Sequence, residues 1–125
     1  MINDKTYQAI FNELNKYLEE GWDKLVVYLE YGKASYSFEF YVKRDGKYIK
    51  CFDLPNVSDK DLNKSFKKID KVVSKERKKI KDAEEWTNMT MIVSKDGKMN
   101  TDFDYTDLEG GTYKYKKAWK NKYLK

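Results

Sequence analysis

The sequence predicts an α+β domain in which an antiparallel sheet of about five strands carries helices on one face. Apolar residues recur at three- and four-residue spacing near the N-terminus and again within residues 59–82, which is typical of amphipathic helices. Between and after these stretches, apolar and polar residues alternate, as they do in half-buried strands. Asp-Gly pairs join the strand-like stretches and favour tight antiparallel hairpins. The expected order is α-β-β-β-α-β-β-α in one domain, residues 1–125.

The first helix is expected to begin at Asn3 or Asp4, which are good N-terminal caps, and to end at Gly21. Its buried stripe follows the helical repeat and comprises Tyr7, Ile10, Phe11, Leu14 and Leu18. Half of residues 24–31 are β-branched or aromatic, and the run is too short for a typical helix, so it predicts a largely buried strand.

The second and third strands are expected to form a hairpin. Residues 35–42 alternate strictly, and the face predicted to be apolar carries Tyr36, Phe38, Phe40 and Val42. Asp45-Gly46 then turns the chain into a third strand over residues 47–52. The lone cysteine, Cys51, lies in this stretch, where we expect a buried structural thiol.

The second helix is expected to begin at Ser58, because Asp61 three residues later resembles the acidic partner of a capping box. Its narrow apolar seam comprises Leu62, Phe66, Ile69, Val73 and Ile80. Lysines fill the remaining circumference. Residues 59–82 hold ten Lys or Arg and five Asp or Glu, and this excess equals the net charge of +5 of the whole chain.

The last two strands, near residues 87–93 and 98–105, are joined by Asp96-Gly97. In the second of them one set of side chains is expected to face the core: Met99, Thr101, Phe103 and Tyr105. The alternate set is expected to point outward: Asn100, Asp102 and Asp104. A short C-terminal helix follows Gly110-Gly111 and places Tyr115 and Trp119 four residues apart.

The composition disfavours catalysis. The chain has no histidine, so it lacks the commonest general base and metal ligand, and it has no glycine-rich phosphate loop. We therefore predict a binding protein without catalytic residues, metal or cofactor. The N-terminus lacks the apolar stretch of a signal peptide, and no apolar run is long enough to span a membrane. A cytoplasmic location is expected.

Two charged regions are candidates for binding. The carboxylates of Asp102, Asp104, Asp107 and Glu109 do not have the spacing of a calcium loop. A solvated acidic edge, or a patch that steers a basic partner, explains them better than a metal site. The lysine-rich helix has the charge of a nucleic-acid-binding element. Its interspersed acids and scarce arginine favour a solvated helix face over a nucleic-acid site.

Three motifs stand out in the second half of the chain: Glu85–Ile92 (EWTNMTMI), Asp96-Gly97-Lys98 and Asp102–Leu108 (DFDYTDL). They resemble the YezG-like immunity proteins, which are bacterial antitoxins. The residues that close the chain, Trp119 and Lys122-Tyr123-Leu124, are also similar, as is the junction Glu20-Gly21-Trp22-Asp23-Lys24. The likeness therefore spans most of the chain.

The resemblance implies a cytoplasmic antitoxin of interbacterial competition. Its partner would be the toxic C-terminal domain, often a nuclease, of an LXG-type effector exported by type VII secretion, which it would neutralise by stoichiometric occlusion. The expected toxin-binding residues are Asp102, Asp104, Asp107, Glu109, Asn88 and Trp86. The second helix is lysine-rich where family members tend to be acidic, which leaves open a partner with an acidic surface or a toxin that is not a nuclease. A nucleic-acid-binding domain that uses residues 59–82 is the less favoured alternative. Neither nucleic acid nor a membrane is the expected partner.

Overall fold

The computed structural model describes residues 4–80 and 85–125. Its helices and strands are α1 (Asp4–Leu14), β1 (Trp22–Tyr31), β2 (Tyr36–Arg44), β3 (Lys47–Lys50), α2 (Asp59–Arg77), β4 (Asn88–Ser94), β5 (Met99–Asp104) and α3 (Tyr113–Tyr123). Single 3-10 turns follow α1 and β3, at Asn15–Tyr17 and Cys51–Asp53. The α+β class and the order of the elements are confirmed.

The five strands form one sheet in the order β3-β2-β1-β4-β5, and every neighbouring pair is antiparallel. The predicted hairpins at Asp45-Gly46 and Asp96-Gly97 are confirmed. Asp45 and Gly46 both have positive φ, 52° and 78°, the backbone conformation that tight hairpin turns require. Strand β1 lies at the centre of the sheet, and β5 forms one edge.

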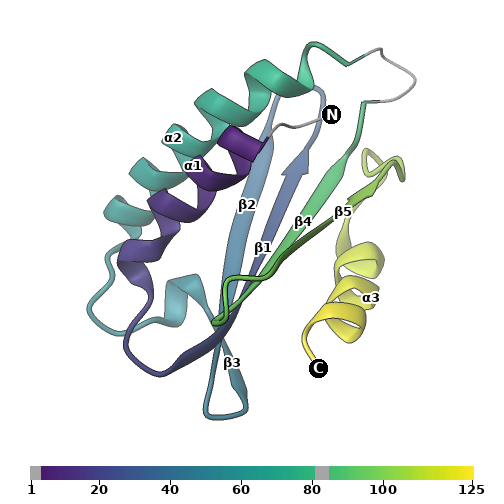
Figure 1. Ribbon diagram of the computed structural model, residues 1–125. Helices are drawn as coiled ribbons and strands as arrows, with labels where there is room; N and C mark the ends of the chain where they lie inside the picture. The colour runs from purple at the N-terminus through teal and green to yellow at the C-terminus, as the bar shows by residue number, and fades with distance from the viewer. Residues whose placement is uncertain (1–3, 81–84) are drawn as a thin grey trace.

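Helices cover both faces of the sheet (Figure 1). Helices α1 and α2 pack on the face that carries Val27, Leu29 and Phe40 and form the main core there. Helix α3 packs on the other face, where Trp119 joins Val26, Tyr28 and Tyr41. The expectation that all helices lie on one face is therefore correct for α1 and α2 and wrong for α3. The reason is that β1 carries apolar side chains on both of its faces, so both faces need cover.

The predicted caps and apolar faces largely agree with the structure. The Ser58 hydroxyl accepts a hydrogen bond from the Asp61 amide at 3.1 Å, which confirms the cap of α2. The seam residues Leu62, Phe66, Ile69 and Val73 are buried, and Ile80 packs against them. The first helix ends earlier than predicted, since its last turn before Gly21 is 3-10 and closes at Tyr17. The proposed cap at Asn3 and the predicted helix end at Asp82 lie outside the described residues.

Strand β5 shows one error in the predicted alternation. Met99 and Phe103 pack against the main core as expected, but Tyr105 is 57% exposed. The strand ends at Asp104, whose Oδ1 accepts hydrogen bonds from the Thr106 amide and hydroxyl at 2.9 and 2.7 Å. This side-chain turn redirects the chain before Tyr105 can continue the pleat. Within residues 4–80 and 85–125, no helix is long and apolar enough to cross a membrane.

Candidate partner-binding surface

The carboxylates of Asp102 and Asp104 lie on one face of β5, as the alternation predicts, and α3 packs against that same face. Asp102 Oδ2 accepts a hydrogen bond from the Tyr123 hydroxyl at 2.8 Å. Asp104 Oδ2 accepts one from the Tyr115 hydroxyl at 3.0 Å. The two acids therefore help to hold α3 on the sheet, in addition to presenting negative charge.

A cleft of about 340 Å³ separates β5 from α3, and its wall includes Asp102, Asp104 and Lys122. Asn88, which is 2% exposed, lies in its lining and donates from Nδ2 to the Leu29 carbonyl at 3.3 Å. Its Oδ1 accepts from the Thr90 hydroxyl at 3.0 Å, and that hydroxyl in turn accepts from Trp119 Nε1 at 2.8 Å. The polar groups below the cleft thus satisfy one another.

The hydrogen bonds across the cleft fix the charge states of their partners. Burial opposes ionisation of Asp104, but hydrogen bonds from Thr106 and Tyr115 outweigh it and lower the pKa of this carboxyl. Burial, followed by the hydrogen bond to Asp104, raises the pKa of Tyr115. Burial and the bond to Asp102 raise the pKa of Tyr123 to about 12. At neutral pH the tyrosines are protonated donors and Asp104 is a negatively charged acceptor.

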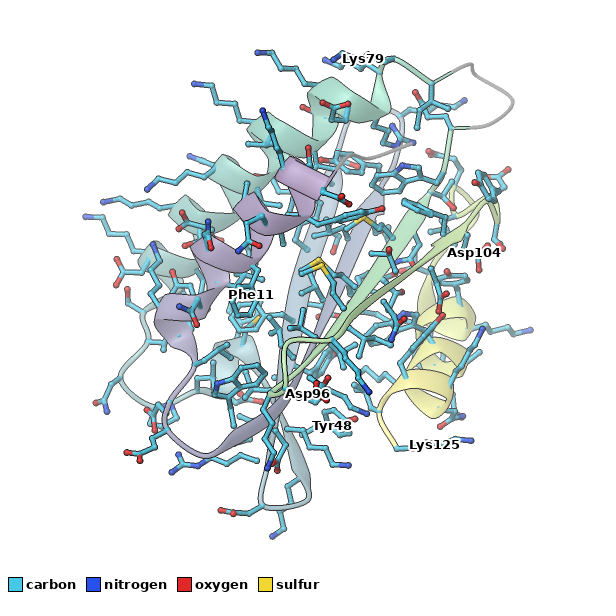
Figure 2. All side chains as sticks on the ribbon, viewed as in Figure 1. Phe11, Tyr48, Lys79, Asp96, Asp104 and Lys125 are labelled. Atoms are coloured by element: carbon cyan, nitrogen blue, oxygen red, sulfur yellow. The ribbon has the colours of Figure 1, made fainter. Side chains whose placement is uncertain are left out.

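The other two predicted acids lie in the loop after β5 and are exposed (Figure 2 labels Asp104 at the start of this loop). Asp107 Oδ1 accepts from the Glu109 amide at 3.0 Å, and Glu109 Oε1 accepts from the Lys33 amide at 3.1 Å. Within the described residues, no Lys or Arg forms an ion pair with Asp102, Asp104, Asp107 or Glu109. Their charge is therefore available to a partner.

Trp86 does not lie on this surface. It is 1% exposed in the main core, with its ring 5.5 Å from Tyr31 and 5.6 Å from Phe103, centroid to centroid. Its side chain stabilises the fold and is not accessible to a partner. Conversely, Tyr115 and Tyr123 were not predicted to meet the acids, although their spacing from Trp119, four residues in each direction, places all three on one side of α3.

These features define a class, a small α+β domain with an acidic surface whose carboxylates form no ion pairs within the described part of the chain. The family model described as "Immunity protein YezG-like" matches residues 3–125, and the chain belongs to this family. It is also similar to Immunity protein YezG of Bacillus spizizenii, at 26% identity over 114 residues that cover 82% of this chain and 68% of that protein. The predicted resemblance is confirmed, and membership supports an immunity role with a toxin as partner.

Proposed function

We propose that this protein neutralises the toxic C-terminal domain of an LXG-type effector by binding it stoichiometrically and covering its active surface. The match to the immunity family over residues 3–125 carries the proposal. In this role the protein acts in the cytoplasm of the producing cell before the effector leaves by type VII secretion. It blocks the toxin by occlusion and performs no catalysis.

We further propose that the toxin is a nuclease and that the acidic surface faces its substrate-binding region. A surface that holds nucleic acid is rich in Lys and Arg, because it must neutralise phosphates. Carboxylates without cationic partners, such as Asp107 and Glu109, complement such a surface and accelerate association with it. Asp102 and Asp104, at the wall of the adjoining cleft, extend the same negative surface.

The four acids differ in how they can be tested. Asp102 and Asp104 also hold the α3 tyrosines, so their reversal would disturb the fold together with the surface. Asp107 and Glu109 are exposed and bond only to backbone amides through their carboxylates. Asp107→Asn with Glu109→Gln is therefore the informative variant, because the amide oxygens can still accept these backbone hydrogen bonds while the negative charge is removed. Glu20→Gln with Asp53→Asn is its control, since these exposed acids lie elsewhere and the change in net charge is the same.

The experiment uses the effector domain that co-purifies with the tagged protein at moderate salt. Its nuclease activity is titrated with wild type and with both double variants. Wild type should inhibit completely at about one equivalent, and the Asp107/Glu109 variant should bind at least tenfold more weakly, because close charge pairs at interfaces contribute about 1.5 kcal/mol or more. The control should bind within about twofold of wild type. Inhibition by far less than one equivalent would exclude occlusion, and equal affinity of all three proteins would exclude this surface.

A further inference from the structure

Helix α2 presents a straight row of lysines to solvent, and Figure 2 shows long side chains extending from this helix away from the sheet. The row comprises Lys60, Lys64, Lys67, Lys71, Lys75 and Lys78, all exposed. Its steps of three or four residues confine it to roughly 80° of the helix circumference, at 3.6 residues per turn. The row lies opposite the buried seam of α2 and is about 27 Å long at 1.5 Å per residue.

The charge of this lysine row is not compensated. In the part of the chain that the structure describes, none of its six members forms an ion pair. Asp70, the acid in the middle of α2, instead accepts a hydrogen bond from the Tyr31 hydroxyl at 2.7 Å. Glu13 of the neighbouring helix pairs with Lys16 and Lys68, which lie outside the row. The carboxylates of Asp70 and Glu13 are thus bonded to groups outside the row.

We propose that the lysine row binds the phosphate backbone of duplex nucleic acid without reading its sequence. Lysine is a mobile point charge suited to phosphate, whereas specific base contacts are most often made by arginine forks, which the row lacks. It also lacks the aromatic side chains on which unpaired bases stack. The row is about 27 Å long, so it can lie along a duplex backbone and contact several phosphates without entering a groove.

Other partners fit this surface less well. Protein interfaces are depleted in lysine and depend on Trp, Tyr and Arg anchors, none of which belongs to the row. A membrane-surface helix inserts its apolar face, but Leu62, Phe66 and Val73 on that face of α2 are buried in the core. Helix α2 lies on one face of the sheet and α3 on the other (Figure 1). Because α3 lines the acidic cleft, the lysine row and the cleft do not obstruct one another.

The test measures fluorescence anisotropy of a labelled DNA duplex of about 20 base pairs with the full chain, from about 50 to about 200 mM NaCl. Neutralising three to four phosphates gives a slope of about −3 in log K against log salt, which is roughly a 60-fold loss over this range. An RNA duplex should bind similarly, because the contacts are to the backbone. Comparable slopes for both duplexes support the proposal.

Two charge-matched variants locate the site. One replaces Lys64, Lys67, Lys71 and Lys75 by Gln, and the other replaces four exposed lysines outside the row: Lys47, Lys114, Lys117 and Lys120. Circular dichroism establishes that both are folded. The row variant should bind at least about tenfold more weakly, with its slope reduced to about −1, whereas the control should stay within about threefold of wild type.

Several outcomes would overturn the proposal. One is that the wild-type protein does not bind the DNA duplex at about 50 mM NaCl. Another is that both variants bind equally more weakly than wild type, which would show that binding depends on net charge and not on the row. Tighter binding to polyglutamate than to duplex would assign the row to an acidic protein, and tighter binding to anionic vesicles would assign it to a membrane. None of these results depends on the toxin, so this proposal and the immunity proposal can fail separately.

Discussion

Replacing Trp119 by alanine should destabilise the protein by about 3–5 kcal/mol, because this side chain anchors α3 to the sheet. Trp119 is 4% exposed and meets Tyr28 edge-on, with ring centroids 4.9 Å apart. Its ring also lies 5.7 Å from that of Tyr41, and its Nε1 donates to Thr90 Oγ1 at 2.8 Å. No other α3 side chain is buried in the described structure.

The magnitude follows from the area that this side chain removes from water. A buried tryptophan removes roughly 150–250 Å². At about 25 cal/mol/Å² this corresponds to roughly 4–6 kcal/mol. Alanine keeps the Cβ and the helix can partly collapse onto the sheet, which lowers the loss, while the missing hydrogen bond adds about 1 kcal/mol. The expected loss is therefore in the range observed for tryptophan truncation in cores.

Urea unfolding followed by circular dichroism measures this loss, with Trp119→Phe as the matched control. Phenylalanine keeps the aromatic packing on Tyr28 and removes only the indole donor and some area, so it should lose about 1–2 kcal/mol. A hydrophobic dye should bind the alanine variant more strongly, since Val26 and Tyr41 become accessible. The reasoning is refuted if Trp119→Ala loses less than about 1 kcal/mol or no more than Trp119→Phe.

Three further outcomes are expected. Burial opposes ionisation of Glu39, but Lys116 at 2.7 Å and Lys50 at 3.1 Å outweigh it and lower its pKa. A lowered folded-state pKa stabilises the protein at neutral pH, and this stability is lost as the pH falls below about 4. Urea midpoints between about pH 6 and pH 3 should therefore change less in Glu39→Gln, and an unchanged profile would contradict this. Burial raises the pKa of Cys51 to about 11. A thiol reagent at about pH 8 should therefore label the unfolded protein far faster than the native one. Comparable labelling rates would argue against burial of this thiol. Ser58→Ala should cost about 1 kcal/mol in urea unfolding and Ser58→Asp almost nothing, whereas equal losses would deny the side chain a capping role.

The periodic elements could be predicted because each pattern depends on local geometry. The seam of α2 and the alternation of β2 follow directly from the helix and strand repeats. The face that α3 covers does not follow from its own sequence. It follows instead from β1, in which Val26, Val27, Tyr28 and Leu29 are consecutive and all buried. Consecutive buried residues in a strand require cover on both faces of the sheet. The prediction of a largely buried β1 is therefore incompatible with the prediction that all helices lie on one face.

The candidate surface was predicted in part. Strand alternation correctly placed Asp102 and Asp104 on one face, but their hydrogen bonds to Tyr123 and Tyr115 join separate elements, and neither periodicity nor spacing reports such contacts. The exposure of Tyr105 depends on a turn that the Asp104 side chain makes with Thr106. Aspartate can serve a strand or a turn, and only the observed hydrogen bonds distinguish the two.

The loop that carries Asp107 and Glu109 is held by contacts within the unbound protein. Leu108 between them is 9% exposed, and the Thr87 hydroxyl donates to the Thr106 carbonyl at 2.7 Å. Glu109 in turn accepts from the Lys33 amide in the turn between β1 and β2. A loop held at both ends and by a buried leucine loses little conformational entropy on binding, so more of the electrostatic attraction appears as affinity. For the proposed toxin contact, this preorganisation favours the loop acids over Asp102 and Asp104, whose carboxylates are partly committed to α3.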